Sequence, residues 1–190
     1  MDFKKTFNRV WLAALWATMT KYNTSTNLIR VIQNLYTKAT SAVLFKSSTG
    51  DWFQTTVGVR QGCPLSSTLF NIFLERIMTE TLENHEGTVS IGGRTITNLH
   101  FANDIDGLAG EEELAKLAEH LDKASTDNSM EINTKKTQLM TNKASGIGTG
   151  IKANGQKLEM FTSFEYLGSA ITDKGSKREI LSRIAQMITA

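Results

Sequence analysis

The sequence predicts an α+β protein in which an antiparallel sheet packs against helices. Stretches with helical spacing of apolar residues alternate with short β-branched and aromatic runs, and these runs come in pairs around turn residues, as hairpins do. No regular β-α-β repeat is present, which favours antiparallel pairing over a parallel sheet. With 190 residues and 40% hydrophobic content, the chain is long enough to bury one core.

Two helices are expected near the N-terminus. Apolar residues recur with helical spacing over residues 10–19 and again over residues 28–36. Ser25 or Thr26 could cap the second helix through a side-chain oxygen. Both helices should present one apolar side to the core.

A hairpin should follow the second helix. Residues 42–45 and 52–57 are rich in β-branched and aromatic side chains, and turn-forming residues occupy 47–51 between them. The alternation of apolar residues predicts that this hairpin is anchored in the core by Trp52. We therefore expect it to position the loop at residues 58–64 without contributing to chemistry.

The most convincing long helix is predicted over residues 65–82. Large apolar residues recur there with helical spacing, Ser66 is placed to cap the helix, and residues 84–87 are placed to end it. Ser67 is expected at the first helical position, where proline is favoured and serine is tolerated. This helix should pack against the predicted sheet.

Two further hairpins follow the long helix. One has strands at residues 88–91 and 95–97 around a Gly-Gly turn. The second spans residues 99–108, with apolar residues on both sides of Asn103 and Asp104, so these two polar residues should lie at its tip.

The last third of the chain predicts one helix followed by short strands. The helix begins at an acidic run, residues 111–113, which suits a helix N-terminus. Candidate strands lie at residues 138–141, 157–159 and 164–167. Residues 176–188 should begin a final helix.

Composition excludes several classes of protein. The single cysteine, Cys63, cannot form an internal disulfide, and the three histidines lack zinc-ligand spacing. The longest apolar stretch, residues 10–17, is far shorter than the roughly 18 residues that cross a bilayer. We therefore expect an intracellular protein, nuclear or cytoplasmic, with no membrane partner. A net charge of +2 permits a nucleic-acid partner without requiring one.

Two acidic residues are candidates for metal chemistry. Asp2 precedes a predicted helix and Asp104 lies at a predicted hairpin tip, and carboxylates brought together from separate strand ends can hold Mg²⁺. Their spacing alone does not show that they meet, and a solvated turn residue or helix cap explains an isolated Asp better. The loop at residues 59–64 suits contact with phosphates or a base pair, although a plain loop before a helix fits equally well.

Five short motifs in order make the functional interpretation more specific. They are residues 2–10, residues 60–66 with 69–71, residues 101–104, the group Asn133, Lys136 and Thr137, and residues 164–168. In this order and separation they resemble the motif series of reverse transcriptases from LINE-type (non-LTR) retrotransposons. The resemblance implies a partial palm at residues 1–168 and the beginning of the thumb or connection at residues 169–190. It also implies an RNA-directed DNA polymerase that uses Mg²⁺, an RNA template, a DNA primer and deoxynucleotides.

The resemblance assigns a role to each matching residue. Asp2 and Asp104 would be metal ligands, and Lys136 would lie near the departing pyrophosphate. Phe7 would lie under the sugar and disfavour a ribose 2′-hydroxyl, although it could equally be a core aromatic. The remaining assignments are Gln61 and Gly62 at the nucleotide and template, Arg60 as a phosphate contact or an exposed loop charge, and Tyr166, Leu167 and Gly168 at the primer.

Departures from the family pattern predict impaired catalysis. Asn103 occupies the first position of the family's paired aspartates, where a neutral amide replaces a metal-binding charge. Asn8 also replaces an aspartate, but there it should only cap a helix.

The fingers subdomain is expected to be absent, since the chain begins at the first motif. The alternatives are a non-catalytic nucleic-acid-binding or interaction protein derived from a palm, and a decayed reading frame with no selected role. The motif order also predicts that Asp2 and Asp104 lie close together, and a separation above about 15 Å, well beyond the reach of shared Mg²⁺ coordination, would contradict this.

Overall fold

The computed structural model describes residues 1–85, 87–141, 150–172 and 180. Its helices are η1 (Thr6–Arg9, 3-10), α1 (Leu12–Lys21), α2 (Thr26–Thr37), α3 (Pro64–Leu82) and α4 (Glu111–Asp127). Its strands are β1 (Thr40–Ser41), β2 (Leu44–Phe45), β3 (Ser48–Thr49), β4 (Phe53–Gln54), β5 (Ser90–Ile91), β6 (Arg94–Thr95), β7 (Asn98–Phe101), β8 (Asp104–Gly107), β9 (Gln138–Leu139), β10 (Lys152–Ala153), β11 (Gln156–Lys157), β12 (Glu159–Met160), β13 (Ser163–Tyr166) and β14 (Ser169–Thr172). The expected mixture of helices and strands is confirmed.

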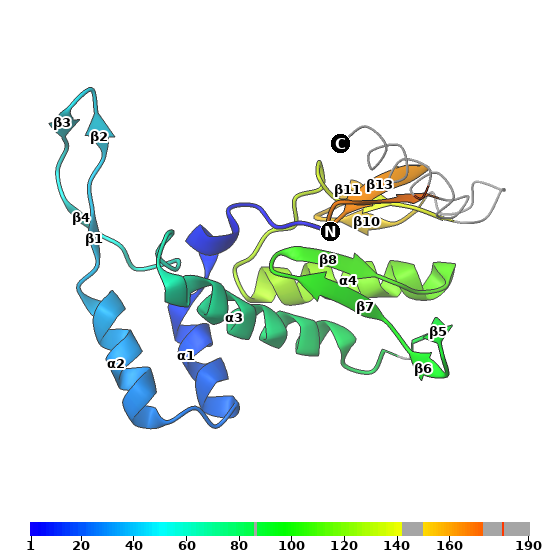
Figure 1. Ribbon diagram of the computed structural model, residues 1–190, viewed down its shortest axis with the longest axis horizontal. Helices are drawn as coiled ribbons and strands as arrows, with labels where there is room; N and C mark the ends of the chain where they lie inside the picture. The colour runs from blue at the N-terminus through cyan, green and yellow to red at the C-terminus, as the bar shows by residue number, and fades with distance from the viewer. Residues whose placement is uncertain (86, 142–149, 173–179, 181–190) are drawn as a thin grey trace.

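Helix α3 is the centre of the core. It packs against α1 and α4 (Figure 1). Its buried apolar residues are Leu69, Phe70, Phe73, Leu74, Ile77 and Met78. They recur in adjacent pairs four residues apart, which gives an apolar stripe wide enough to contact two neighbouring helices. Helices α1, α3 and α4 therefore form the centre of the hydrophobic core.

The start of α3 differs from the expectation. Pro64 is the first helical residue and Cys63 precedes it as the N-cap, so the helix begins one residue earlier than predicted. Proline is favoured at this position because its fixed φ suits the helix and its missing N–H is not needed there. Ser66 does not cap the helix but donates a hydrogen bond from Oγ to the Arg60 carbonyl oxygen, and Ser67 lies in the first turn rather than at its first position.

The strands of the described chain pair only two by two. Six of the seven pairs are antiparallel, and the pair β9 with β12 is parallel. The predicted hairpins β5–β6, β7–β8 and β13–β14 are confirmed. The single antiparallel sheet that we expected is not formed by these strands, because they are short and each ladder ends within two to four residue pairs.

The first hairpin stands away from the rest of the molecule (Figure 1). Its tip is at Lys46 and Ser47, which both have positive φ, 44° and 68°, as two-residue hairpin turns require. The turn is therefore shorter than the predicted one at residues 47–51. Trp52 is 70% exposed, so our prediction that it anchors the core is wrong. The alternation of apolar residues was real, but no part of the described chain covers either face.

Helix α2 buries one side in the core, as predicted. Ile29, Ile32 and Tyr36 bury one side of α2, while Ser25 is its N-cap residue without a side-chain hydrogen bond.

The predicted final helix at residues 176–188 lies outside the described residues except for residue 180. The predicted boundary between palm and thumb falls in the turn between β13 and β14 and stays a prediction. Within the described ranges, no helix is both long enough and apolar enough to cross a membrane.

Candidate catalytic site

Residues 1–4 form an extended segment between two distant parts of the chain. On one side Met1 and Ile105 exchange two backbone hydrogen bonds, so the segment extends alongside β8. On the other side Phe3 forms a β-bridge with Ile132. The Lys4 N–H donates to the Glu131 carbonyl oxygen and the Asn133 N–H donates to the Asp2 carbonyl oxygen, both at 2.8 Å. These bonds confirm the prediction that Asp2 lies beside the hairpin that carries residues 103 and 104.

The side chains of Asp2 and Asn103 are in direct contact. Asn103 Nδ2 donates a hydrogen bond to Asp2 Oδ1 at 2.9 Å, and Lys136 Nζ lies 3.4 Å from Asp2 Oδ2. Only 16% of the Asp2 side chain is exposed, whereas Lys136 is 71% exposed. Both carboxylate oxygens of Asp2 are therefore engaged, one by a neutral amide and the other by an ammonium group.

A polar cavity of about 130 Å³ joins four of the five predicted motifs. It is lined by Met1, Asp2, Asp104, Ile105, Asp106, Lys136, Gln138, Phe164, Glu165 and Tyr166. The first, third, fourth and fifth motifs or their immediate neighbours contribute to this lining. The structure thus brings Asp2, Asp104, Lys136 and Tyr166 together, with Asn103 at the edge through its bond to Asp2.

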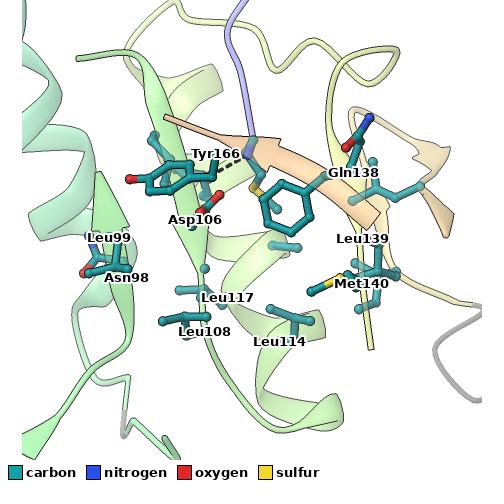
Figure 2. Close-up of a pocket in the computed structure, with 18 of the residues that line it drawn as sticks. Asn98, Leu99, Asp106, Leu108, Leu114, Leu117, Gln138, Leu139, Met140 and Tyr166 are labelled. Atoms are coloured by element: carbon teal, nitrogen blue, oxygen red, sulfur yellow. Dashed lines mark hydrogen bonds between the residues drawn. The ribbon is translucent and has the colours of Figure 1, made fainter. Parts of the chain in front are cut away.

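Asp106 is a member of this cavity that sequence reasoning missed. Burial raises the pKa of the Asp106 carboxyl above its usual range, and the charge of Asp104 raises it further while the Met1 ammonium opposes the rise. Burial, followed by the charges of Asp106 and Asp104, also raises the pKa of Tyr166, which Figure 2 shows beside Asp106. The spacing could have revealed Asp106, because side chains two apart on a strand share a face.

The oxygen ligands of the cavity suit Mg²⁺ in kind but not in number. Asp2 and Asp104 offer the hard carboxylate oxygens that this ion prefers. Asn103, however, directs its amide nitrogen at Asp2, and an N–H group cannot bind a cation. In the described ranges, no three His, Cys, Asp or Glu side chains are grouped closely enough to hold a metal ion. The residues therefore fit the ion only in part.

The second motif lies beside the first but apart from the cavity. The N–H of Val59 donates to the Phe7 carbonyl, and Gln61 Nε2 lies 3.4 Å from Asn8 Oδ1. Gly58 passes so close to this backbone that an added Cβ would come within 2.9 Å of the Asn8 Cα. Asn8 therefore contacts Gln61, and the cap of α1 is Trp11 rather than Asn8, contrary to our expectation.

Phe7, Arg60 and Gly62, which were predicted near the nucleotide and template, have structural roles within the fold. The Phe7 ring packs against Phe70 with centroids 5.4 Å apart, which agrees with the alternative that it is a core aromatic. Arg60 donates to the Leu35 carbonyl and lies over the Tyr36 ring at 5.7 Å, so it is not a free loop charge. Gly62 has φ of +80°, a conformation that favours glycine. Phe7, Arg60, Gln61 and Gly62 do not line the cavity.

The three residues predicted at the primer divide between cavity and turn. Tyr166 lines the cavity at the end of β13. Leu167 and Gly168 form the two-residue turn to β14, with φ values of 48° and 78°. The predicted hairpin of the fifth motif is therefore present, and its contact with a primer stays a prediction.

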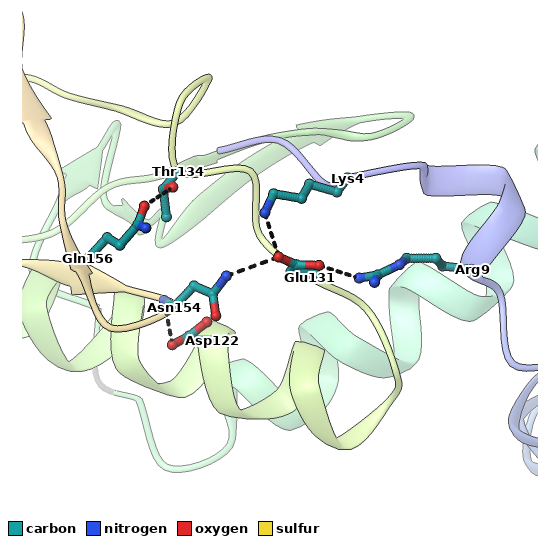
Figure 3. Close-up of polar contacts among 7 residues, drawn as sticks. All are labelled: Lys4, Arg9, Asp122, Glu131, Thr134, Asn154 and Gln156. Atoms are coloured by element: carbon teal, nitrogen blue, oxygen red, sulfur yellow. Dashed lines mark hydrogen bonds and ion pairs between the residues drawn. The ribbon is translucent and has the colours of Figure 1, made fainter.

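Glu131 holds the N-terminal segment in place (Figure 3). Its Oε1 lies 2.5 Å from Lys4 Nζ and 3.2 Å from Asn154 Nδ2, and its Oε2 lies 2.8 Å from Arg9 Nη1. The hydrogen bond from Lys4, followed by the charges of Lys4 and Arg9, lowers the pKa of Glu131. Sequence reasoning did not identify this residue, because its three partners are distant in sequence.

Comparison with known proteins places the chain in a family. The profile described as reverse transcriptase (RNA-dependent DNA polymerase) matches residues 1–171, and the chain therefore belongs to the reverse transcriptase family. A Retrovirus-related Pol polyprotein from the type-1 retrotransposable element R2 of Popillia japonica is 28% identical over 105 residues, which are 55% of this chain and 17% of that protein. The corresponding polyprotein from the type-2 element R2DM of Drosophila melanogaster is 29% identical over 106 residues, 55% of this chain and 10% of that protein.

These relatives confirm the resemblance to non-LTR retrotransposon reverse transcriptases. The aligned segments cover less than a fifth of either relative. The activity, substrates and partners of the whole polyproteins therefore come to this chain only as proposals.

Proposed function

We propose that the cavity around Asp2 is the nucleotidyl-transfer site of an RNA-directed DNA polymerase and that Asn103 has weakened it. The observation that carries this proposal is the 2.9 Å hydrogen bond from Asn103 Nδ2 to Asp2 Oδ1. The bond supports the convergence of the first and third motifs on one point. It also supports impairment, because the same bond blocks an oxygen that a metal ion would need.

Asp2 and Asp104 are the residues that would hold Mg²⁺. When bound, the ion would orient the attacking primer hydroxyl and stabilise the charge that develops on the phosphates. Lys136, next to Asp2, would neutralise the departing pyrophosphate, since an ammonium group is a strong phosphate contact. Asp106 adds negative charge to the same wall of the cavity.

Asn103 weakens cation binding in two ways. It contributes no charge where a carboxylate would attract a divalent ion. Its N–H also stabilises Asp2 without any metal, so an entering cation would have to break that hydrogen bond. The ion pair between Lys136 and Asp2 adds a further competitor. Each of these contacts favours the metal-free arrangement of Asp2.

The substrates follow from the family description and the remaining motifs. An RNA template, a DNA primer and deoxynucleotides would meet at the cavity, with Gln61 and Gly62 toward the nucleotide and template. Phe7 would lie under the sugar while its ring packs on Phe70. Tyr166, Leu167 and Gly168 would support the primer from the β13–β14 hairpin. Arg60 would keep the loop in place through its contacts with Leu35 and Tyr36.

The test grafts residues 1–171 into an active reverse transcriptase of the same family. Three grafted proteins are compared in Mg²⁺-dependent primer extension: the unaltered segment, Asn103→Asp, and Asn103→Asp combined with Asp2→Ala. We expect no extension, recovery and renewed loss, in that order. Asn8→Asp is the matched control, because it adds the same charge beside Gln61 rather than in the cavity.

Two results would overturn the proposal. Robust extension by the unaltered graft would show that a carboxylate at position 103 is unnecessary. Equal activity of the Asn103→Asp graft with and without Asp2→Ala would show that Asp2 is not a metal ligand.

A further inference from the structure

Charge is unevenly divided along this chain. Residues 1–74 contain eight Lys and Arg against two Asp and Glu, a net charge of +6. Residues 75–190 contain thirteen against seventeen, a net charge of −4. The overall charge of +2 hides this contrast. The N-terminal part, which includes α1, α2 and the first hairpin, should therefore have a positive potential and attract polyanions.

Most of these cations lack a carboxylate partner. Lys4 and Arg9 are paired with Glu131 from the acidic part of the chain. The other basic residues of the N-terminal part are Lys5, Lys21, Arg30, Lys38, Lys46 and Arg60. Among the described residues, none of these six forms an ion pair. Arg60 is held by the Leu35 carbonyl and the Tyr36 ring, whereas the other five are exposed and can contact phosphates.

The hairpin formed by residues 40–54, which we call the arm, exposes aromatic rings. Phe45 is 68%, Trp52 70% and Phe53 53% exposed, and the arm stands clear of the helices in Figure 1. Phe53 pairs with Ser41 in the ladder at the base of the arm, and Phe45 pairs with Ser48 in the ladder next to its tip. Trp52 directly precedes β4 and lies between the two ladders.

Cations accompany these rings. At the tip, Lys46 Nζ lies 5.4 Å from the centre of the Phe45 ring. Lys38 is exposed at the foot of the arm, where α2 ends. Asp51 is the only acidic residue between Asp2 and Glu75. The arm therefore combines aromatic rings with nearby positive charge, which is the combination that binds the bases and phosphates of a single strand.

We propose that the arm binds single-stranded nucleic acid, with bases stacked on Phe45, Trp52 and Phe53 and phosphates at Lys46 and Lys38. The charge distribution favours this occupant over an apolar protein surface, which would offer Lys46 and its neighbours no anion. Exposed rings both near the tip and at the base suit a flexible strand that extends along the arm, because successive bases can stack on successive rings. The inference deepens the proposed function and rests on it for the class of partner, but it does not depend on the metal site.

Binding is measured by fluorescence anisotropy with a labelled oligouridylate of about 20 nucleotides, long enough to exceed the span of a typical single-strand site. The buffer contains EDTA, so the metal site makes no contribution. We expect Phe45→Ala with Trp52→Ala to weaken binding at least about fivefold, since each lost stacking contact has an effect of that order. The matched control is Tyr22→Ala, an exposed aromatic at the other end of α2 from the arm.

The charge contribution has its own pair of variants. Lys46→Gln should reduce the slope of log affinity against log salt by about 0.7, the value for one phosphate contact on a single strand. Lys21→Gln, the same change of charge at the far end of α1, should leave the slope unchanged. A duplex of the same length should bind more weakly than the single strand, because its bases cannot stack on the arm.

Three outcomes would overturn the proposal. The first is that the unaltered chain does not bind the oligonucleotide, and the second is that the arm variant and Tyr22→Ala bind it equally well. The third is that the protein self-associates and that the arm variants abolish this self-association without changing the affinity for the oligonucleotide. The last result would make the arm a protein interface. Loss of arm binding leaves the extension test of Asn103→Asp untouched, and inactivity of that graft leaves the arm result untouched, so the two proposals fail separately.

Discussion

The candidate catalytic site and the arm show two different ways in which this sequence determines structure. Around Asp2, backbone and side-chain hydrogen bonds join residues separated by more than 100 positions, as between Met1 and Ile105 or Asp2 and Asn103. In the arm, the strand pairs join residues at most 14 positions apart. The site therefore depends on the packing of the whole core, whereas the arm depends on its own turn and ladder.

The difference shows what a local pattern can and cannot indicate. Alternating apolar residues predicted the hairpin at the arm, and the hairpin is present. The same alternation suggested a buried face with Trp52 as its anchor, and Trp52 is exposed. Alternation of apolar and polar residues indicates that a strand has two different faces, but the burial of either face depends on which other segments pack against it.

The largest effect should come from removing the centre of the core. Phe73 is fully buried in α3, so Phe73→Ala should destabilise the protein by about 3–5 kcal/mol and disorder the site with it. Urea denaturation provides the measurement. Phe53→Ala, the same substitution in the arm, is the control and should cost less than about 0.5 kcal/mol. Similar costs for both would contradict the contrast between the two regions.

A smaller and pH-dependent effect is expected at Glu131. Its pKa in the folded protein is lowered mainly by the hydrogen bond from Lys4, so its contribution to stability is present above the unfolded pKa and lost as pH falls through the folded value. Glu131→Gln should therefore lower the melting temperature at neutral pH and have little effect in acid below that folded value. Glu159→Gln, at an exposed carboxylate, is the control. A difference from the unaltered chain that is independent of pH would exclude the ion pairs as its cause.

The smallest effect should come from Trp52 itself. Because the ring is 70% exposed, Trp52→Ala should change the free energy of unfolding by less than about 0.5 kcal/mol. Trp16, which packs edge-on against Tyr36 at 5.8 Å, is the matched control and should cost considerably more. Thermal and urea unfolding of the two variants measure this difference. A large loss at Trp52 would restore our original prediction of a core anchor.

Much of the helical fold could be predicted because its signals are local. The positions of α1, α2, α3 and α4 followed from the spacing of apolar residues. The turn at Lys46 and Ser47 was misplaced, since neither residue is the Asn or Gly that usually marks such a turn. The start of α3 was misplaced because Ser66 was expected to cap, whereas its hydroxyl bonds to Arg60 instead.

The candidate site was predictable only as a set of motifs. Their order indicated that Asp2 and Asn103 would meet, and they do. The sequence could not indicate that Asn103 would present its nitrogen, since the orientation of an amide depends on its partners. Glu131 was missed because only the fold brings Lys4, Arg9 and Asn154 to it.

The central claim is that the site around Asp2 lacks one carboxylate for binding divalent cations. Titration of the 190-residue chain with Mn²⁺, followed by electron paramagnetic resonance, tests it without any need for polymerase activity. Asn103→Asp should tighten binding on the order of tenfold or more, because one added charge at about 4 Å has a substantial effect even in water. Combining Asn103→Asp with Asp2→Ala should abolish the gain. Equal affinity of the unaltered chain and Asn103→Asp would contradict the claim.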